Sequence, residues 1–220
     1  MSNLDFQPAM QSPLHHFNLA AKAVPANDSQ GVWANEMPLL AYISLRGNQH
    51  NAPFMSAANQ ALGIALPTQP CTLEHATWGY VCWLSPDEWL VICSRTQRAK
   101  LQTALEAYLD GIHSQVADNS GGYTSVLLQG KNATDVLQHC TVYDVHALAA
   151  NKIVGTTFGK TSVFLHRQDF LQQQDFLHQQ DFLLRHDKAY ALILRRSFAD
   201  YIWRYLERAA APYGFGIAKL

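Results

Sequence analysis

The strongest constraint on the fold is a β-hairpin signal at residues 77–93, TWGYVCWLSPDEWLVIC. Two runs rich in aromatic and β-branched residues flank the sequence Ser-Pro-Asp-Glu at 85–88. Those four residue types suit a tight turn, and the flanking runs suit paired strands. We therefore predict an antiparallel hairpin in the first half of the chain.

The segments around the hairpin predict the order β-α-β-β-α. Residues 39–47 alternate as a strand does, and a helix follows with Pro53 near its start and Gly63 past its end. A second helix, capped by Thr96 and ended by Gly111, is expected after the hairpin. Its expected core face consists of Leu101, Ala104, Leu105, Tyr108 and Leu109.

The sequence of the second half predicts a similar order of elements, although the two halves share no residue identity. Extended stretches at 112–118 and 122–129 precede a short helix capped by Asn132, and two further strands lead to a final helix. Ser197 is its expected N-cap and Asp200 occupies the capping-box position. Its expected core face consists of Phe198, Ile202, Tyr205, Leu206 and Ala209.

These patterns predict an α+β protein built from two successive ferredoxin-like β-α-β-β-α halves, with helices covering mainly antiparallel sheet. The expected parts are an extended leader at 1–36, a first half at 37–111, a second half at 112–214 with an insertion at about 168–185, and a tail at 215–220.

Composition argues against two classes of partner. The chain has 220 residues, 48% of them hydrophobic, which suffices for a packed core. Sixteen Lys and Arg against 17 Asp and Glu leave a formal charge of -1 without a basic run, so we expect no binding to nucleic acid or an anionic membrane. No apolar run approaches the roughly 20 residues that span a bilayer, and the N-terminus does not resemble a signal peptide. We expect a cytoplasmic protein.

No sequence motif identifies an enzyme. GTTFGKT at 155–161 ends like a phosphate-binding loop, but its glycines enclose three residues where that motif needs four. The four cysteines are spaced neither as a disulfide scaffold nor as paired zinc ligands, so we expect reduced thiols and no metal site. Asp87 and Glu88 form a carboxylate pair in the hairpin turn, where turn capping and an acid–base or ligand role are both open.

A short repeat interrupts the second half. Gln-Asp-Phe-Leu begins at Gln168, Gln174 and Gln180. On a helix this six-residue step would spread the phenylalanines around the cylinder, whereas on a strand an even step keeps them on one side. The repeat lies between two predicted strands, where a hairpin loop tolerates insertions. A duplicated hairpin tip and a partner-binding motif are both open.

Six blocks, taken in order, resemble one known family. They are LAYISLRGN (40–48), ALGIALP (61–67), WLSPDEWLVI (83–92), VADNSGGYTSVLLQG (116–130), DVLQHCTVYDVH (135–146) and RRSFADYIWRYLERAA (195–210). The chain resembles the gamma subunit family of heterotetrameric sarcosine oxidase over nearly all of residues 12–214, except for the QDFL copies. That family is similar to the folate-binding domain of the glycine-cleavage T-protein, which agrees with two α+β halves.

The resemblance implies a non-catalytic subunit of a complex that oxidatively demethylates sarcosine to glycine. The products include hydrogen peroxide and, with tetrahydrofolate, methylenetetrahydrofolate. The implied partners are the alpha, beta and delta subunits, chiefly the large alpha subunit. The resemblance places FAD, FMN, NAD, zinc and tetrahydrofolate in those partners, so we expect this chain to bind no cofactor. The alternative is a free-standing tetrahydrofolate-binding or aminomethyltransferase-like protein of the T-protein type.

The resemblance also indicates residues to examine. Asp87, Glu88 and Asp118 are the candidates for a folate pocket, and no residue is predicted to be catalytic. Structural roles compete for the others: a capping box for Ser197 and Asp200, and core packing for Trp89. The family-motif or interface candidates are Arg46, Gly47, Pro86, Trp89, Ser120, Gly130, Asp144, Ser197, Phe198, Asp200 and Tyr201.

Overall fold

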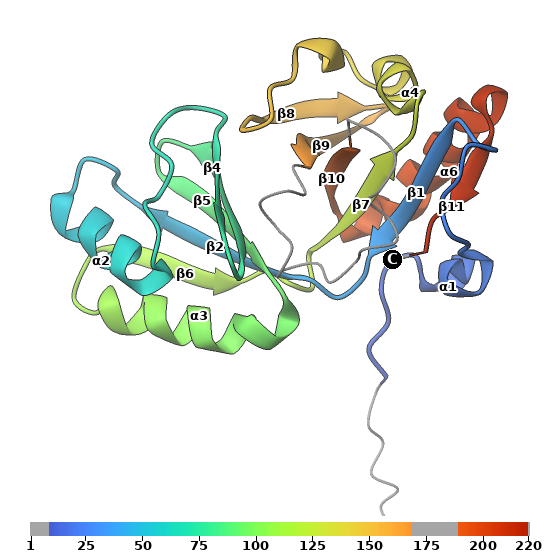
Figure 1. Cartoon of the computed structure of the whole chain (residues 1–220). Coiled ribbons are helices and arrows are strands. Elements are labelled where there is room, and N and C mark those ends of the chain that lie inside the picture. The colour runs from blue at the N-terminus through green and yellow to red at the C-terminus, as the bar shows by residue number, and fades with distance from the viewer. Residues whose placement is uncertain (1–8, 169–188, 220) are drawn as a thin grey trace, which may run out of the picture.

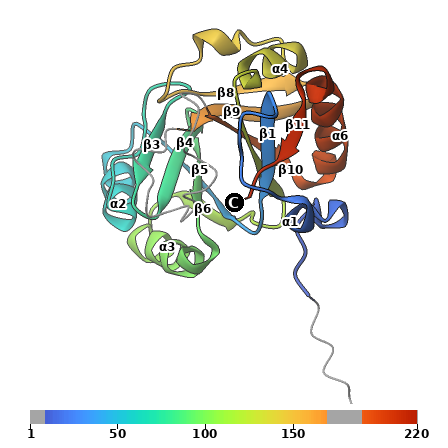
Figure 2. The same ribbon diagram turned by 45° about the vertical axis from the view of Figure 1, so that its right-hand side comes forward.

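A computed structural model describes residues 9–168 and 189–219 of the chain. They form four layers, in which two sheets face each other and helices cover the outer face of each sheet (Figures 1 and 2). This confirms the predicted α+β fold with largely antiparallel sheets. The QDFL copies lie outside the described residues, apart from Gln168.

The first sheet has five strands, and every neighbouring pair in it is antiparallel. The predicted hairpin is confirmed, since β4 and β5 pair up to Ser85 and Glu88. Pro53 is the second residue of the first covering helix, and Gly63, with φ 70°, caps its end. In spatial order the strands are β3 (Leu73–Ala76), β4 (Gly79–Ser85), β5 (Glu88–Cys93), β2 (Ala41–Gly47) and β6 (Ser114–Asp118), covered by α2 (Ala52–Leu62) and α3 (Arg95–Tyr108).

The second sheet has six strands, and its one parallel pair is β1 with β11. Strands β9 and β10 are antiparallel neighbours that pair up to Gln168 and Ala189. In spatial order the strands are β11 (Phe215–Ile217), β1 (Val32–Met37), β7 (Tyr123–Gln129), β10 (Ala189–Arg195), β9 (Thr161–Gln168) and β8 (Ile153–Phe158), covered by α4 (Ala133–Cys140) and α6 (Ala199–Ala210).

The two sheets are built on one plan. The series β2-α2-β3-β4-β5-α3-β6 corresponds element by element to β7-α4-β8-β9-β10-α6-β11. The spatial orders also correspond, 3-4-5-2-6 against 8-9-10-7-1-11, with β1 inserted before the last strand. Compared with the predicted pattern, each half has an additional strand before its hairpin, β3 or β8. Each half also has an additional strand after its second helix, β6 or β11.

Each sheet contains strands from more than one of the expected segments. The expected leader contains η1 (His15–Phe17), α1 (Leu19–Lys22) and β1, and β1 pairs with β7 of the second sheet. Strand β6, expected in the second half, pairs with β2 of the first sheet, and the expected tail contains β11. Sequence alternation indicates a strand but does not indicate which neighbour supplies its hydrogen bonds, so these pairings had no local signal.

Polar side chains join the facing surfaces of the two sheets. The hydroxyls of Tyr42 on β2 and Ser125 on β7 lie 2.7 Å apart. The Tyr80 hydroxyl on β4 lies 3.3 Å from the His166 ring on β9, and both side chains are fully buried. Because each contact links one sheet to the other, both help to fix how the halves pack.

Two helix starts differ from the predictions. Helix α3 begins at Arg95 rather than after Thr96, and Tyr108, predicted to face the core, is 50% exposed. Helix α6 begins at Ala199, because the 3-10 turn η4 (Arg196–Phe198) contains Ser197, the predicted N-cap, and Phe198, the predicted first helical residue. The predicted core faces were wrong at two residues, since Tyr108 is the last residue of α3 and Phe198 lies in η4 before α6 begins.

The remaining short elements are η2 (Val145–Ala147) and η5 (Ala211–Tyr213). Among the helices of the described ranges, none combines the length and the apolar character that crossing a membrane requires. The four cysteines are free thiols, three of them buried and Cys71 exposed.

Candidate functional site

The first group of predicted site residues lies at the tip of the β4–β5 hairpin. The Arg46 guanidinium lies 2.7 Å from one Asp87 carboxylate oxygen, and the Ser85 hydroxyl donates to the other at 2.7 Å. The hydrogen bond from Ser85 and then that from Arg46 lower the pKa of Asp87. Pro86 is exposed beside them, and Glu88 is half-buried opposite Arg46 in the strand register. The polar side chains at this tip therefore bond to one another.

Gly47 and Trp89 lie beneath this turn. A Cβ atom on Gly47 would approach the Phe54 ring to 2.2 Å, so only glycine fits there. Trp89 is fully buried, its ring centroid lies 5.6 Å from that of Phe54, and its indole N–H donates to the Pro67 carbonyl at 2.7 Å. Both residues therefore hold α2 against the first sheet.

The second group surrounds Asp118 at the end of β6. Arg98 donates to one Asp118 oxygen at 2.7 Å, and the backbone N–H and hydroxyl of Ser120 donate to the other. Partial burial by itself favours the neutral carboxyl, but the bonds from Ser120 and Arg98 outweigh it and lower the pKa of Asp118. The Ser120 hydroxyl also accepts from the Tyr42 backbone N–H at 3.1 Å. This network ties the end of β6 to β2 and α3.

The structure does not bring the three folate-pocket candidates into one cavity. Asp87 shares a surface depression with Arg46, whereas Asp118 lines a different cavity with Arg98. In the register of β2 and β6, Arg46 pairs with Gln115 and Ile43 with Asp118, which places the two groups about 10 Å apart along the sheet.

Gly130 and Asp144 have local backbone roles. Gly130 adopts φ 123°, and a Cβ atom there would lie 2.4 Å from the Gly31 carbonyl oxygen, so glycine lets the end of β7 cross the chain before β1. The exposed Asp144 carboxylate accepts from the His146 backbone N–H at 3.1 Å and caps η2.

The last group lies at the start of α6, where the predicted capping box does not form. The Ser197 hydroxyl accepts no capping bond from a backbone N–H of α6. Asp200 contacts His16 at 2.8 Å and Arg204 at 2.9 Å instead. Phe198 is 44% exposed, and Tyr201 is exposed beside it, with its hydroxyl accepting from the Lys160 N–H at 3.0 Å. Trp203, not Phe198, fills the core here.

We expect Ser197→Ala to change the free energy of unfolding by less than about 0.5 kcal/mol, because Ser197 caps no helical N–H group. A capping serine would cost about 1 kcal/mol on the same change. Urea unfolding of the two proteins measures the difference. Asn51→Ala is the matched control, since Asn51 does cap α2 by accepting from the Phe54 N–H, and a larger loss is expected there.

One cavity was missed by the sequence prediction. It has a volume of about 230 Å³ and lies at the junction of the two sheets and the N-terminal segment. Three arginines line it, Arg95 and Arg98 from α3 and Arg196 from η4, together with Asp118 and Ser120. Arg196 directly follows β10. Since it lies about a hundred residues from the other two in sequence, no local pattern could reveal that they converge.

A repeated α+β plan, with two facing sheets and outer helices, defines the structural class. The chain is similar to a chain of the heterotetrameric sarcosine oxidase from Corynebacterium sp. U-96 in complex with pyrrole 2-carboxylate, with 21% identity, a TM-score of 0.75, and coverage of 96% of this chain and 98% of that one. It is also similar to the glycine cleavage system aminomethyltransferase T from Bartonella henselae, with 12% identity and a TM-score of 0.64. The latter match covers 89% of this chain and 56% of that one. Both likenesses show a shared fold.

The family follows from the sequence. The model of the "Sarcosine oxidase, gamma subunit family" matches residues 46–212. This span is well over half of the chain, and the chain belongs to that family, as the ordered blocks predicted. No curated protein matches the sequence.

Proposed function

We propose that this chain is the gamma subunit of a heterotetrameric sarcosine oxidase. The observation that carries the proposal is the family match over residues 46–212. The fold, shared over nearly the full length of a chain of such an enzyme, supports it. The complex would oxidatively demethylate sarcosine to glycine, with formation of hydrogen peroxide and methylenetetrahydrofolate. The chain would assemble with alpha, beta and delta subunits, which would hold FAD, FMN, NAD, zinc and tetrahydrofolate.

Within this complex we propose a structural rather than a catalytic role. Asp87, Asp118 and Asp200 each form an ion pair with an arginine. Their pKa values are lowered, chiefly by hydrogen bonds that stabilise the charged carboxylate. A carboxylate with a lowered pKa is a weak base near neutral pH, which suits an architectural group better than a general base.

Co-expression with the alpha, beta and delta subunits, followed by size-exclusion chromatography, tests the assembly. We expect the chain to elute with the other three subunits and the purified complex to oxidise sarcosine. A folded chain that elutes alone while the other subunits assemble without it would contradict the proposal.

The first contact surface to test is the exposed aromatic pair at the start of α6. Phe198 in η4 is exposed, and so is Tyr201, three residues further on in α6. Aromatic residues are enriched at subunit interfaces, so we expect Phe198→Asp to reduce the co-eluting fraction at an unchanged melting temperature. Tyr108→Asp, which alters an exposed aromatic residue at the end of α3, is the matched control. Full assembly of the Phe198 variant would exclude this surface while leaving the subunit proposal standing.

A second candidate function is tetrahydrofolate binding by the free chain, favoured by the fold shared with aminomethyltransferase T. This chain spans about half the length of that protein. Calorimetry with tetrahydrofolate discriminates between the two, because micromolar binding by the isolated chain would favour the second candidate. Asp118→Asn and Asp87→Asn then show which of the two carboxylate groups takes part.

A further inference from the structure

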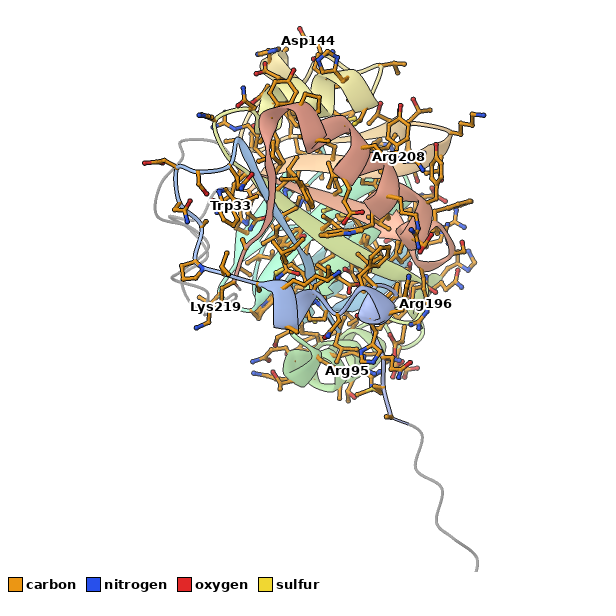
Figure 3. The ribbon with its side chains drawn as sticks, turned by 90° about the vertical axis from the view of Figure 1, so that its right-hand side faces the viewer. Trp33, Arg95, Asp144, Arg196, Arg208 and Lys219 are labelled. Atoms are coloured by element: carbon orange, nitrogen blue, oxygen red, sulfur yellow. The ribbon has the colours of Figure 1, made fainter. Side chains whose placement is uncertain are left out.

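The cavity at the junction of the two halves is unusually rich in positive charge. Arg95, Arg98 and Arg196 line it, and Asp118 is the one acidic residue among its described lining residues. Three positive charges against one negative leave a formal excess of two. In Figure 3, Arg95 and Arg196 lie on the same side of the molecule, where the N-terminal segment crosses it.

The existing partners do not neutralise this excess. Asp118 is bonded to Arg98 and Ser120. Arg196 donates to the Gln11 carbonyl oxygen at 3.2 Å, which is a neutral group. Arg95 forms no ion pair within residues 9–168 and 189–219. In the described part of the chain, two guanidinium groups from different halves thus line one cavity without an ion-pair partner.

The start of α3 adds to the same field. A helix N-terminus carries partial positive charge and favours acidic residues, yet the first turn of α3 has no acidic residue and contains Arg95 and Arg98. The Ser94 hydroxyl caps no helical N–H and instead bonds to the Thr96 hydroxyl at 2.9 Å. Departures from local preference are expected where a site serves a function.

We propose that this cavity binds a small oxyanion, a carboxylate or a phosphate group, held by Arg95 and Arg196 in front of the Arg98–Asp118 pair. The planar guanidinium of arginine suits both groups because it donates two parallel hydrogen bonds. A cavity of about 230 Å³ is smaller than the usual site for a drug-sized ligand, so it suits a molecule with few atoms beyond the anionic group. The bound anion would join α3 of the first half to η4 of the second.

Titration of the full-length chain with inorganic phosphate and, separately, with acetate tests this proposal. Sodium chloride keeps the ionic strength constant, and thermal unfolding reports binding to the folded state. We expect a saturable rise in melting temperature with at least one of the two anions. Arg95→Gln and Arg196→Gln should each weaken the apparent affinity tenfold or more. Arg208→Gln, an exposed change on the last turn of α6, should bind as the unaltered chain does.

A second readout separates ligand binding from a merely structural role. Without the anion, Arg95→Gln should melt at or above the temperature of the unaltered chain, because it removes an unfavourable positive charge from a helix N-terminus. With saturating anion the order should reverse. The proposal is overturned if neither anion gives a saturable rise, if both arginine variants keep the rise, or if Arg208→Gln loses it equally.

Discussion

Trp89→Ala should lower the free energy of unfolding by about 3–5 kcal/mol, the range found when a large aromatic side chain is deleted from a packed core. Trp89 is fully buried between the first sheet and α2, against the Phe54 ring. Its removal would leave a cavity and would also deprive the buried Pro67 carbonyl of the indole N–H that now lies 2.7 Å away. Urea unfolding followed by tryptophan fluorescence and by circular dichroism measures the loss.

Trp89→Phe is the matched variant for this change. It keeps an aromatic ring beside Phe54 but loses the hydrogen bond to Pro67, so a smaller loss than for alanine is expected. A Trp89→Ala protein that unfolds within 1 kcal/mol of the unaltered chain would contradict the core role. If that variant folded normally but no longer joined its partner subunits, Trp89 would act through the interface instead.

The predictable part of the fold came from local signals. The β4–β5 hairpin was predicted because its turn chemistry and its strand composition lie within one short stretch. Helix α2 was predicted because Pro53 and Gly63 mark its two ends. Strands β3 and β8 were missed; each lies at a sheet edge and has a mixed burial pattern without regular alternation.

The errors at helix starts have a common cause. Ser197 and Thr96 have side chains typical of an N-cap, but the backbone starts each helix elsewhere. In α6 the 3-10 turn η4 precedes the helix, so Asp200 is free to pair with His16 from the N-terminal segment. A capping preference is worth about 1 kcal/mol, and tertiary contacts of this kind can outweigh it.

The candidate site was predicted less well than the fold. Trp89 and Gly130 were predicted as family-motif or interface residues, and their geometry reveals packing and backbone roles. The arginine-lined cavity requires α3 and η4 to meet across the two halves, and this meeting depends on how the two sheets face each other. No periodicity within either half encodes that arrangement.

We expect a second large effect on the free energy of unfolding at the interface between the two sheets, and this effect depends on pH. Burial, together with the nearby His75, lowers the pKa of His166 from its ordinary 6.5 to about 4, although a hydrogen bond to the Arg167 carbonyl opposes the shift. The ring nitrogen Nδ1 donates to that carbonyl at 3.0 Å, so Nε2 accepts from the Tyr80 hydroxyl. The folded chain therefore holds His166 neutral.

The sign of the effect follows from proton binding. Between pH 6.5 and pH 4 the unfolded chain binds a proton at residue 166 and the folded chain does not, so stability rises with pH in this window. Titration of His166 costs no stability above pH 6.5, where the ring is neutral in both states, and the cost grows as the pH falls toward 4. A shift of this size corresponds to about 3 kcal/mol. The carboxylates of Asp87, Asp118 and Asp200, whose pKa values are lowered, lose their contributions at more acidic pH.

Urea unfolding at a series of pH values between 4 and 7 measures this slope. His166→Gln should flatten it, because the glutamine side chain can still bond to Tyr80 but does not titrate. His50→Gln, an exposed change beside α2, should keep the full slope. An equal slope in the His166 and His50 variants would show that other groups cause it. A flattened slope in the first alone would show that acid destabilises the chain at the contact joining its two halves, because His166 and Tyr80 come from opposite sheets.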